Sequence, residues 1–145
     1  MKMELIEKKK ILIICTGNSC RSQMAEGIAR EAGWLAYSAG TNPESAVNPY
    51  AVKVMAEMGI DIAHHTPHST SKYVNDNFYI VATVCDNAKE NCPVFTGRCE
   101  YQLHHGFEDP ADATGNDKEI TKVYRRVRDK IQIWIDAISE DYCNN

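Results

Sequence analysis

Short apolar segments alternate with longer amphipathic stretches along this chain. Four of the segments are rich in β-branched and aromatic residues, and each is only a few residues long. Runs of this length and composition are typical of buried strands. We therefore expect four strands, at residues 11–14, 34–40, 78–85 and 97–105.

Helical patterns fill the stretches between and after these strands. Residues 21–32 are good helix formers followed by Gly33, a common helix stop. Residues 48–58 begin with Asn-Pro, and residues 117–139 carry apolar side chains at helical spacing. Strands that alternate with helices indicate an α/β fold with a mostly parallel four-stranded sheet flanked by helices. No linker interrupts the pattern, so residues 1–145 are expected to form a single domain.

Composition narrows the classes of partner. The formal charge is −4 and hydrophobic residues make up 43% of the 145 positions. This balance gives no reason to expect nucleic acid or an anionic membrane surface as a partner. The sequence has no apolar run of membrane-spanning length, and its charged N-terminus does not resemble a signal peptide. We expect a cytoplasmic protein that works as a monomer.

Six cysteines are many for a cytoplasmic chain of this size. They stand at positions 15, 20, 85, 92, 99 and 143. Cytoplasmic thiols stay reduced unless a disulfide is transient, which favours redox chemistry or metal binding over a structural disulfide. The spacings contain no Cys-x-x-Cys pair, and the "HHTPH" segment reads as a polar loop, so no metal site is expected. We assign no chemistry to Cys99 and Cys143.

The segment "CTGNSCR" joins the first expected strand to the first expected helix. Unpaired N–H groups and the helix dipole attract an anion at such a junction. Gly17 and Asn18 tolerate the backbone of a tight anion-binding loop, and Arg21 can clamp an oxyanion with two N–H groups. Cys15 then becomes a nucleophile aimed at the central atom, with Ser22 placed to donate to its sulfur. The oxyanion loop would comprise Thr16, Gly17, Asn18, Ser19, Cys20, Arg21 and Ser22.

Two other interpretations of this loop are less favourable. The Gly-Lys-Ser/Thr ending of a Walker loop is absent, so nucleotide binding of that kind is not indicated. A buried cysteine beside a surface arginine also occurs by chance. In parallel sheets, however, ligands bind at the carboxyl ends of the strands, and both Cys15 and Cys85 fall at such ends. This placement favours a chemical role.

The segment "CTGNSCRS" resembles the phosphate loop of the low-molecular-weight phosphotyrosine phosphatase fold. With its continuation, "CTGNSCRSQMAEG" is similar to the thioredoxin-coupled arsenate reductases on that fold. Phosphatases of the group usually have proline where this chain has Gln23. The likeness continues over nearly the whole chain, through "YSAGT", "NPYAVKVMAEMGIDI", "VCDNAKENCP", "HHGFEDPA" and "RRVRDKI".

The resemblance implies reduction of arsenate to arsenite, with the two electrons supplied by thiols. Cys15 would attack arsenic, and Cys85 would then attack Cys15, leaving a Cys15–Cys85 disulfide. Cys92 would attack Cys85, and thioredoxin would reduce the resulting Cys85–Cys92 disulfide. Cys20, inside the loop, is a rival for the second thiol. The family also points to Asp109, held extended by the following proline, as the acid that protonates the departing oxygen.

We expect no cofactor apart from the external reductant. Some relatives also hold a potassium ion that steadies the phosphate loop. Asn18, Glu26, Ser38 and Thr66 match that site, but His68 stands where a carboxylate is required. We therefore do not expect this protein to depend on potassium.

Two other functions remain open. One is a phosphotyrosine phosphatase of the same fold. Three features argue against it: Gln23, the pair Cys85 and Cys92, and the lack of tyrosines after Asp109. Weak phosphatase activity could nevertheless coexist with reduction. The other is a non-catalytic thiol sensor or oxyanion-binding module, in which Cys15 would be dispensable.

Overall fold

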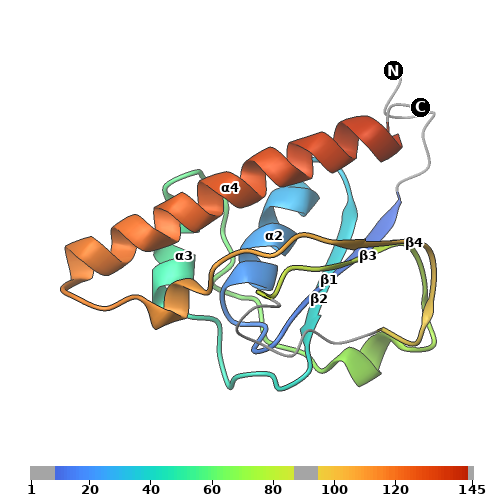
Figure 1. The fold of residues 1–145 in the computed structure, drawn as a ribbon, viewed down its shortest axis with the longest axis horizontal. Coiled ribbons are helices and arrows are strands. Elements are labelled where there is room, and N and C mark those ends of the chain that lie inside the picture. Colours follow the sequence, from blue (N-terminus) through green and yellow to red (C-terminus); the bar gives the residue numbers. More distant parts are fainter. Residues whose placement is uncertain (1–8, 87–94, 144–145) are drawn as a thin grey trace.

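A computed structural model describes residues 9–86 and 95–143 of the chain. Its four strands form one sheet in the order β2-β1-β3-β4, and every neighbouring pair is parallel. The strands are β1 (Lys10–Cys15), β2 (Leu35–Gly40), β3 (Asn77–Thr83) and β4 (Arg98–His104). The expected α/β fold and parallel sheet are confirmed (Figure 1).

Three α-helices follow the expected pattern to within a few residues. They are α2 (Arg21–Glu31), α3 (Pro49–Ala56) and α4 (Asp117–Cys143), and two short 3₁₀ helices are η1 (Thr70–Tyr73) and η2 (Pro110–Asp112). The side chain of Asn48 accepts a hydrogen bond from the Tyr50 N–H, which caps α3 and explains the Asn-Pro start. Gly33, with φ 106°, follows the end of α2 as expected.

Strand β3 ends at Thr83, two residues before the expected end at Cys85. Its last pairing partner in β4 is His104, and beyond this pair the chain continues as a loop. Val84 and Cys85 stay fully buried in that loop, so the apolar run outlasts the strand. Cys85 therefore lies just beyond the carboxyl end of β3.

Both faces of the sheet are buried at β1, which accounts for the unbroken apolar run of this strand. Ile11 and Ile13 belong to the core shared with α2, α3 and α4. Leu12 and Ile14 point to the other face, where they pack in a second cluster with aromatic side chains including Phe78. Figure 1 shows α4 running across α2 and α3. Within the described residues, no helix combines the length and apolar character needed to cross a membrane.

The carboxyl end of β1 is tightly packed against β2. Cys15 is the last residue of β1 and is paired in register with Gly40, the last residue of β2. A Cβ atom at Gly40 would collide with the backbone oxygen of Thr16 and approach the Asn18 nitrogen to 3.0 Å. Only glycine fits beside the loop that follows β1, so this edge of the sheet positions the loop.

Candidate active site

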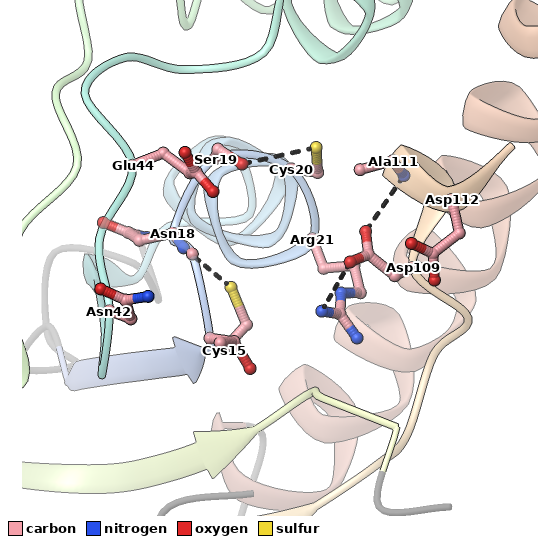
Figure 2. A pocket seen from close by; sticks show the side chains of 12 residues that line it. Cys15, Asn18, Ser19, Cys20, Arg21, Asn42, Glu44, Asp109, Ala111 and Asp112 are labelled. Atoms are coloured by element: carbon pink, nitrogen blue, oxygen red, sulfur yellow. Dashed lines mark hydrogen bonds and ion pairs between the residues drawn. The ribbon is translucent and has the colours of Figure 1, made fainter. Parts of the chain in front are cut away.

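A cavity of about 300 Å³ opens at the carboxyl edge of the sheet (Figure 2). Three segments enclose it: the loop from β1 to α2, the chain after β2, and η2. The lining residues are Cys15, Thr16, Gly17, Asn18, Ser19, Cys20, Arg21, Asn42, Glu44, Asp109, Ala111 and Asp112. Six of the seven residues expected to form the oxyanion loop are in this lining, and the seventh, Ser22, is buried behind it.

The sulfur of Cys15 has two polar neighbours. The Asn18 N–H donates a hydrogen bond to it over 3.2 Å, and the Ser22 hydroxyl oxygen lies 2.9 Å away. The thiol is free and only 2% exposed, although it borders the cavity. The backbone N–H of Asn18 and the hydroxyl of Ser22 thus both contact the sulfur of a residue that lines the cavity.

Asn18 holds the loop in shape. Its φ of 52° lies in the left-handed region, which asparagine tolerates better than most residues. The carboxamide oxygen accepts a hydrogen bond from the His68 N–H at 2.9 Å. The carboxamide nitrogen donates to the hydroxyls of Ser22 at 2.7 Å and Ser38 at 2.9 Å. These bonds tie the loop to α2, to β2 and to the segment before η1.

Positive charge is provided by Arg21 and by the start of α2. Arg21 is 2% exposed, and its guanidinium donates to the Phe107 carbonyl over 3.2 Å. Cys20, the residue before the helix, provides no side-chain cap. The first N–H groups of the helix are thus not capped by a side chain, at an end that borders the cavity. An oxyanion is the ligand that this arrangement suits best.

Asp109 borders the cavity beside Arg21. One carboxylate oxygen lies 3.5 Å from the Arg21 guanidinium, and the other accepts the Ala111 N–H at 3.0 Å, which caps η2. Figure 2 shows Asp109 and Arg21 together on one side of the cavity, with Cys15 on the other side. The structure therefore brings these three expected residues to one site.

Sequence analysis missed three polar residues of the lining. Asn42 and Glu44 come from the chain after β2, and Asp112 comes from η2. Only the position of Asn42 and Glu44, shortly after the carboxyl end of a strand, could have indicated them. With Asp109, the two carboxylates give the cavity an acidic border around its basic floor.

The remaining cysteines differ sharply in their surroundings. Cys85 is fully buried, and the Cys15 thiol is free. Cys92 lies outside the described residues. Burial raises the pKa of Cys20 to about 11, against the effect of its contact with the Tyr124 hydroxyl. A neutral thiol of this kind is a poor second nucleophile.

Among the residues that match a potassium site, the Glu26 carboxylate already has partners within the chain. One oxygen of the Glu26 carboxylate accepts the Ser38 hydroxyl at 2.7 Å, and the other pairs with the Arg30 guanidinium at 2.9 Å. His65 lies 3.5 Å from the same carboxylate, and His68 and Arg30 line the adjoining cavity. The Arg30 guanidinium thus already balances the charge of this carboxylate. Nowhere in the described part of the chain do three or more His, Cys, Asp or Glu side chains cluster as metal ligands.

A parallel α/β sheet with a Cys–Arg oxyanion loop at its edge defines the class of protein. The chain belongs to the low molecular weight phosphotyrosine protein phosphatase family, whose model matches residues 10–143. It is 44% identical over 138 residues to an arsenate reductase of Halalkalibacterium halodurans, an alignment that covers 93% of this chain and 98% of that protein. An arsenate reductase of Bacillus subtilis is 43% identical over 129 residues, covering 87% and 91%.

A solved structure supports the same relationship. An arsenate reductase in the phosphate binding state superposes with a TM-score of 0.76 at 30% identity, covering 92% of this chain and 98% of that one. The family resemblance drawn from the sequence is thereby confirmed.

Proposed function

We propose that this protein reduces arsenate to arsenite with thiols as the electron source. The observation that carries the proposal is the convergence of Cys15, Arg21 and Asp109 on one cavity. The arsenate reductases that are 43–44% identical to this chain support the choice of substrate. The related structure in a phosphate-binding state supports a tetrahedral oxyanion as the ligand.

The first step is an attack by the Cys15 thiolate on arsenic. Arg21 and the N–H groups at the start of α2 hold the oxyanion and balance its charge. A sulfur–arsenic bond forms while one arsenic–oxygen bond breaks, and Asp109 supplies the proton that lets this oxygen leave as water. The Asn18 N–H donates to the Cys15 sulfur and holds it in place for the attack.

The second step transfers two electrons to arsenic. Cys85 attacks the Cys15 sulfur, the sulfur–arsenic bond pair moves to arsenic, and arsenite leaves. Cys92 then attacks Cys85, which frees Cys15 and forms the Cys85–Cys92 disulfide for reduction by thioredoxin.

The relay requires a reducing compartment and no bound cofactor. We therefore propose that the protein works as a monomer in the cytoplasm. We also propose that potassium is not required, because Arg30 already neutralises the Glu26 carboxylate. Replacing KCl by NaCl at equal ionic strength should leave kcat/KM unchanged. Activation by potassium alone would contradict this part of the proposal.

The deciding experiment compares two activities of one preparation. Arsenate-dependent NADPH oxidation is followed with thioredoxin and thioredoxin reductase, beside hydrolysis of p-nitrophenyl phosphate. Cys85→Ser should abolish the first and spare the second, while the control Cys99→Ser should spare both. Hydrolysis without arsenate reduction would instead identify a phosphatase, and full turnover in Cys15→Ser would favour a non-catalytic role for this thiol.

A second activity is expected at the same site. Cys15, Arg21 and Asp109 are also the groups that hydrolysis of a phosphomonoester needs, so slow phosphatase activity should accompany reduction. The carboxylates of Glu44 and Asp112 at the border disfavour large anionic substrates such as acidic phosphopeptides. Small phosphoesters should therefore be hydrolysed faster than acidic phosphopeptides.

A further inference from the structure

A chain of hydrogen bonds leads from the sulfur of Cys15 to a histidine outside the cavity. Ser22 lies 2.9 Å from the sulfur, and its oxygen accepts the carboxamide N–H of Asn18 at 2.7 Å. The carboxamide nitrogen of Gln23 donates to the Asn18 carboxamide oxygen over 3.3 Å. The Gln23 oxygen in turn lies 3.0 Å from Nδ1 of His65. Neither Gln23 nor His65 lines the oxyanion cavity.

Two backbone groups fix the direction of the bonds that join Asn18, Gln23 and His65. The Gln23 carboxamide nitrogen donates to the Thr66 carbonyl over 3.3 Å, a contact that a carboxamide oxygen could not make. The His68 N–H donates to Asn18, so the group facing it is the Asn18 oxygen. Both carboxamides are therefore oriented without ambiguity, and Nδ1 of His65 must carry the proton that the Gln23 oxygen accepts.

The same logic reaches the nucleophile. Asn18 donates to the Ser22 oxygen, which leaves the Ser22 hydroxyl hydrogen available to the Cys15 sulfur. When Cys15 is a thiolate it has no hydrogen to give, so Ser22 is the donor in this contact. Reversing the Asn18 carboxamide would place its oxygen against Ser22 and draw that hydrogen away from the sulfur. The orientation of one buried carboxamide thus decides whether the serine donates to the thiolate.

We propose that Gln23 and His65 are positioning residues for the nucleophile, which they serve by holding Asn18 in the orientation that makes Ser22 a donor to Cys15. The inference deepens the proposed function and rests on Cys15 being its nucleophile. Gln23 is 1% exposed and the His65 side chain is 7% exposed, so water competes little with these bonds.

His65 provides the donor in both of its protonation states. Nδ1 carries a proton in imidazolium and in the neutral tautomer that the Gln23 oxygen selects. Glu26 is the carboxylate nearest to it, 3.5 Å from the same nitrogen, and it favours that proton too. Asparagine can replace Nδ1–H with its own carboxamide N–H, whereas leucine cannot, which provides a conservative and a disruptive variant.

The test measures the alkylation of Cys15 by iodoacetamide in the reduced full-length protein. Peptide mass analysis separates Cys15 from the other thiols, and the rate is recorded from pH 5 to pH 9. Gln23→Leu and His65→Leu should each slow the reaction about fivefold at pH 7, the factor for a hydrogen bond worth about 1 kcal/mol. Both should shift the midpoint of the pH profile upward.

Two comparisons separate positioning from a general loss of structure. His65→Asn should react at the wild-type rate, because asparagine retains an N–H donor. The control Gln132→Leu on α4 should also react at the wild-type rate. In a Ser22→Ala background, Gln23→Leu should add no further slowing, because the group that it orients is gone.

Each contrary result has one meaning. Equal slowing by Gln23→Leu with and without Ser22 would overturn the inference, as would a wild-type rate in His65→Leu or a His65→Asn variant as slow as His65→Leu. If Gln23→Leu fails to fold, the two His65 variants decide alone. Failure of iodoacetamide to modify Cys15 in the wild type would contradict the proposed function itself, whereas modification that none of the variants changes would contradict only the positioning role.

Discussion

Replacing Asp109 by asparagine isolates the proton that the proposed first step requires. The Asp109 carboxylate has two structural roles beside that one: it caps η2 through the Ala111 N–H and lies 3.5 Å from the Arg21 guanidinium. Asparagine is as good a cap as aspartate, so Asp109→Asn keeps the first role. It removes the negative charge and the transferable proton together.

The expected losses in stability and in rate differ in size. The Asp109 side chain is 29% exposed and its ion pair is long, so losing the pair should cost less than about 1 kcal/mol of folding free energy. General acid catalysis contributes about 10²- to 10⁴-fold, which corresponds to about 3–5 kcal/mol of the activation barrier. The rate of arsenite formation should therefore fall at least about 100-fold while the protein stays folded.

A single-turnover assay separates the steps. Excess enzyme is mixed with arsenate, quenched at intervals, and analysed for arsenite and for alkylated thiols. Asp109→Asn should slow the attack on arsenic and leave exchange between protein thiols nearly unchanged, and the exposed control Asp76→Asn should match the wild type. A loss smaller than about threefold, or equal slowing of attack and exchange, would refute the assignment of Asp109 as the acid.

Three further predictions follow from contacts in the fold. Gly40→Ala should weaken phosphate binding measured by calorimetry, because the added Cβ displaces the oxyanion loop; unchanged affinity would contradict the packing at this edge. Hydrogen bonds from Arg125 and then Arg128 hold the pKa of Glu57 at about 2, below its ordinary 4.5. The stability that these hydrogen bonds contribute is complete above pH 4.5 and lost as the pH falls toward 2. Glu57→Gln should therefore lower the Tm at pH 7 more than at pH 2. An equal change in Tm at both pH values would contradict the lowered pKa of Glu57. At pH 7.5, iodoacetamide should modify Cys15 well before Cys20, because burial raises the pKa of Cys20 to about 11. The reverse order would contradict the raised pKa of Cys20.

Local patterns were sufficient to predict most of the fold and the centre of the site. The centre of the site is built from consecutive segments: the β-branched run of β1, the glycine and asparagine after it, and the helix formers beyond Arg21. Because these segments adjoin in sequence, local patterns also predict that they adjoin in space. The end of β3 was harder to predict from the sequence. Val84 and Cys85 are as buried as the strand itself, and only the pairing partner that β4 supplies shows where the strand stops.

The parts that could not be predicted depend on segments that are distant in sequence. Glu44 borders the cavity because the end of β2 lies beside the end of β1, a register that no local pattern reveals. His65 reaches Gln23 across 42 positions of sequence. A histidine in a polar loop carries no sign of such a contact, and its role emerges only once the backbone groups around Gln23 are placed.

The oxyanion loop is short, yet the contacts that shape it come from far along the chain. Asn18 is held by the backbone of His68, 50 residues later, and Arg21 by that of Phe107, 86 residues later. Such long-range contacts form late in folding because closing long loops is entropically costly. A chain cut before Phe107 would lack the carbonyl that Arg21 contacts, so the oxyanion loop depends on a segment far beyond the motif itself.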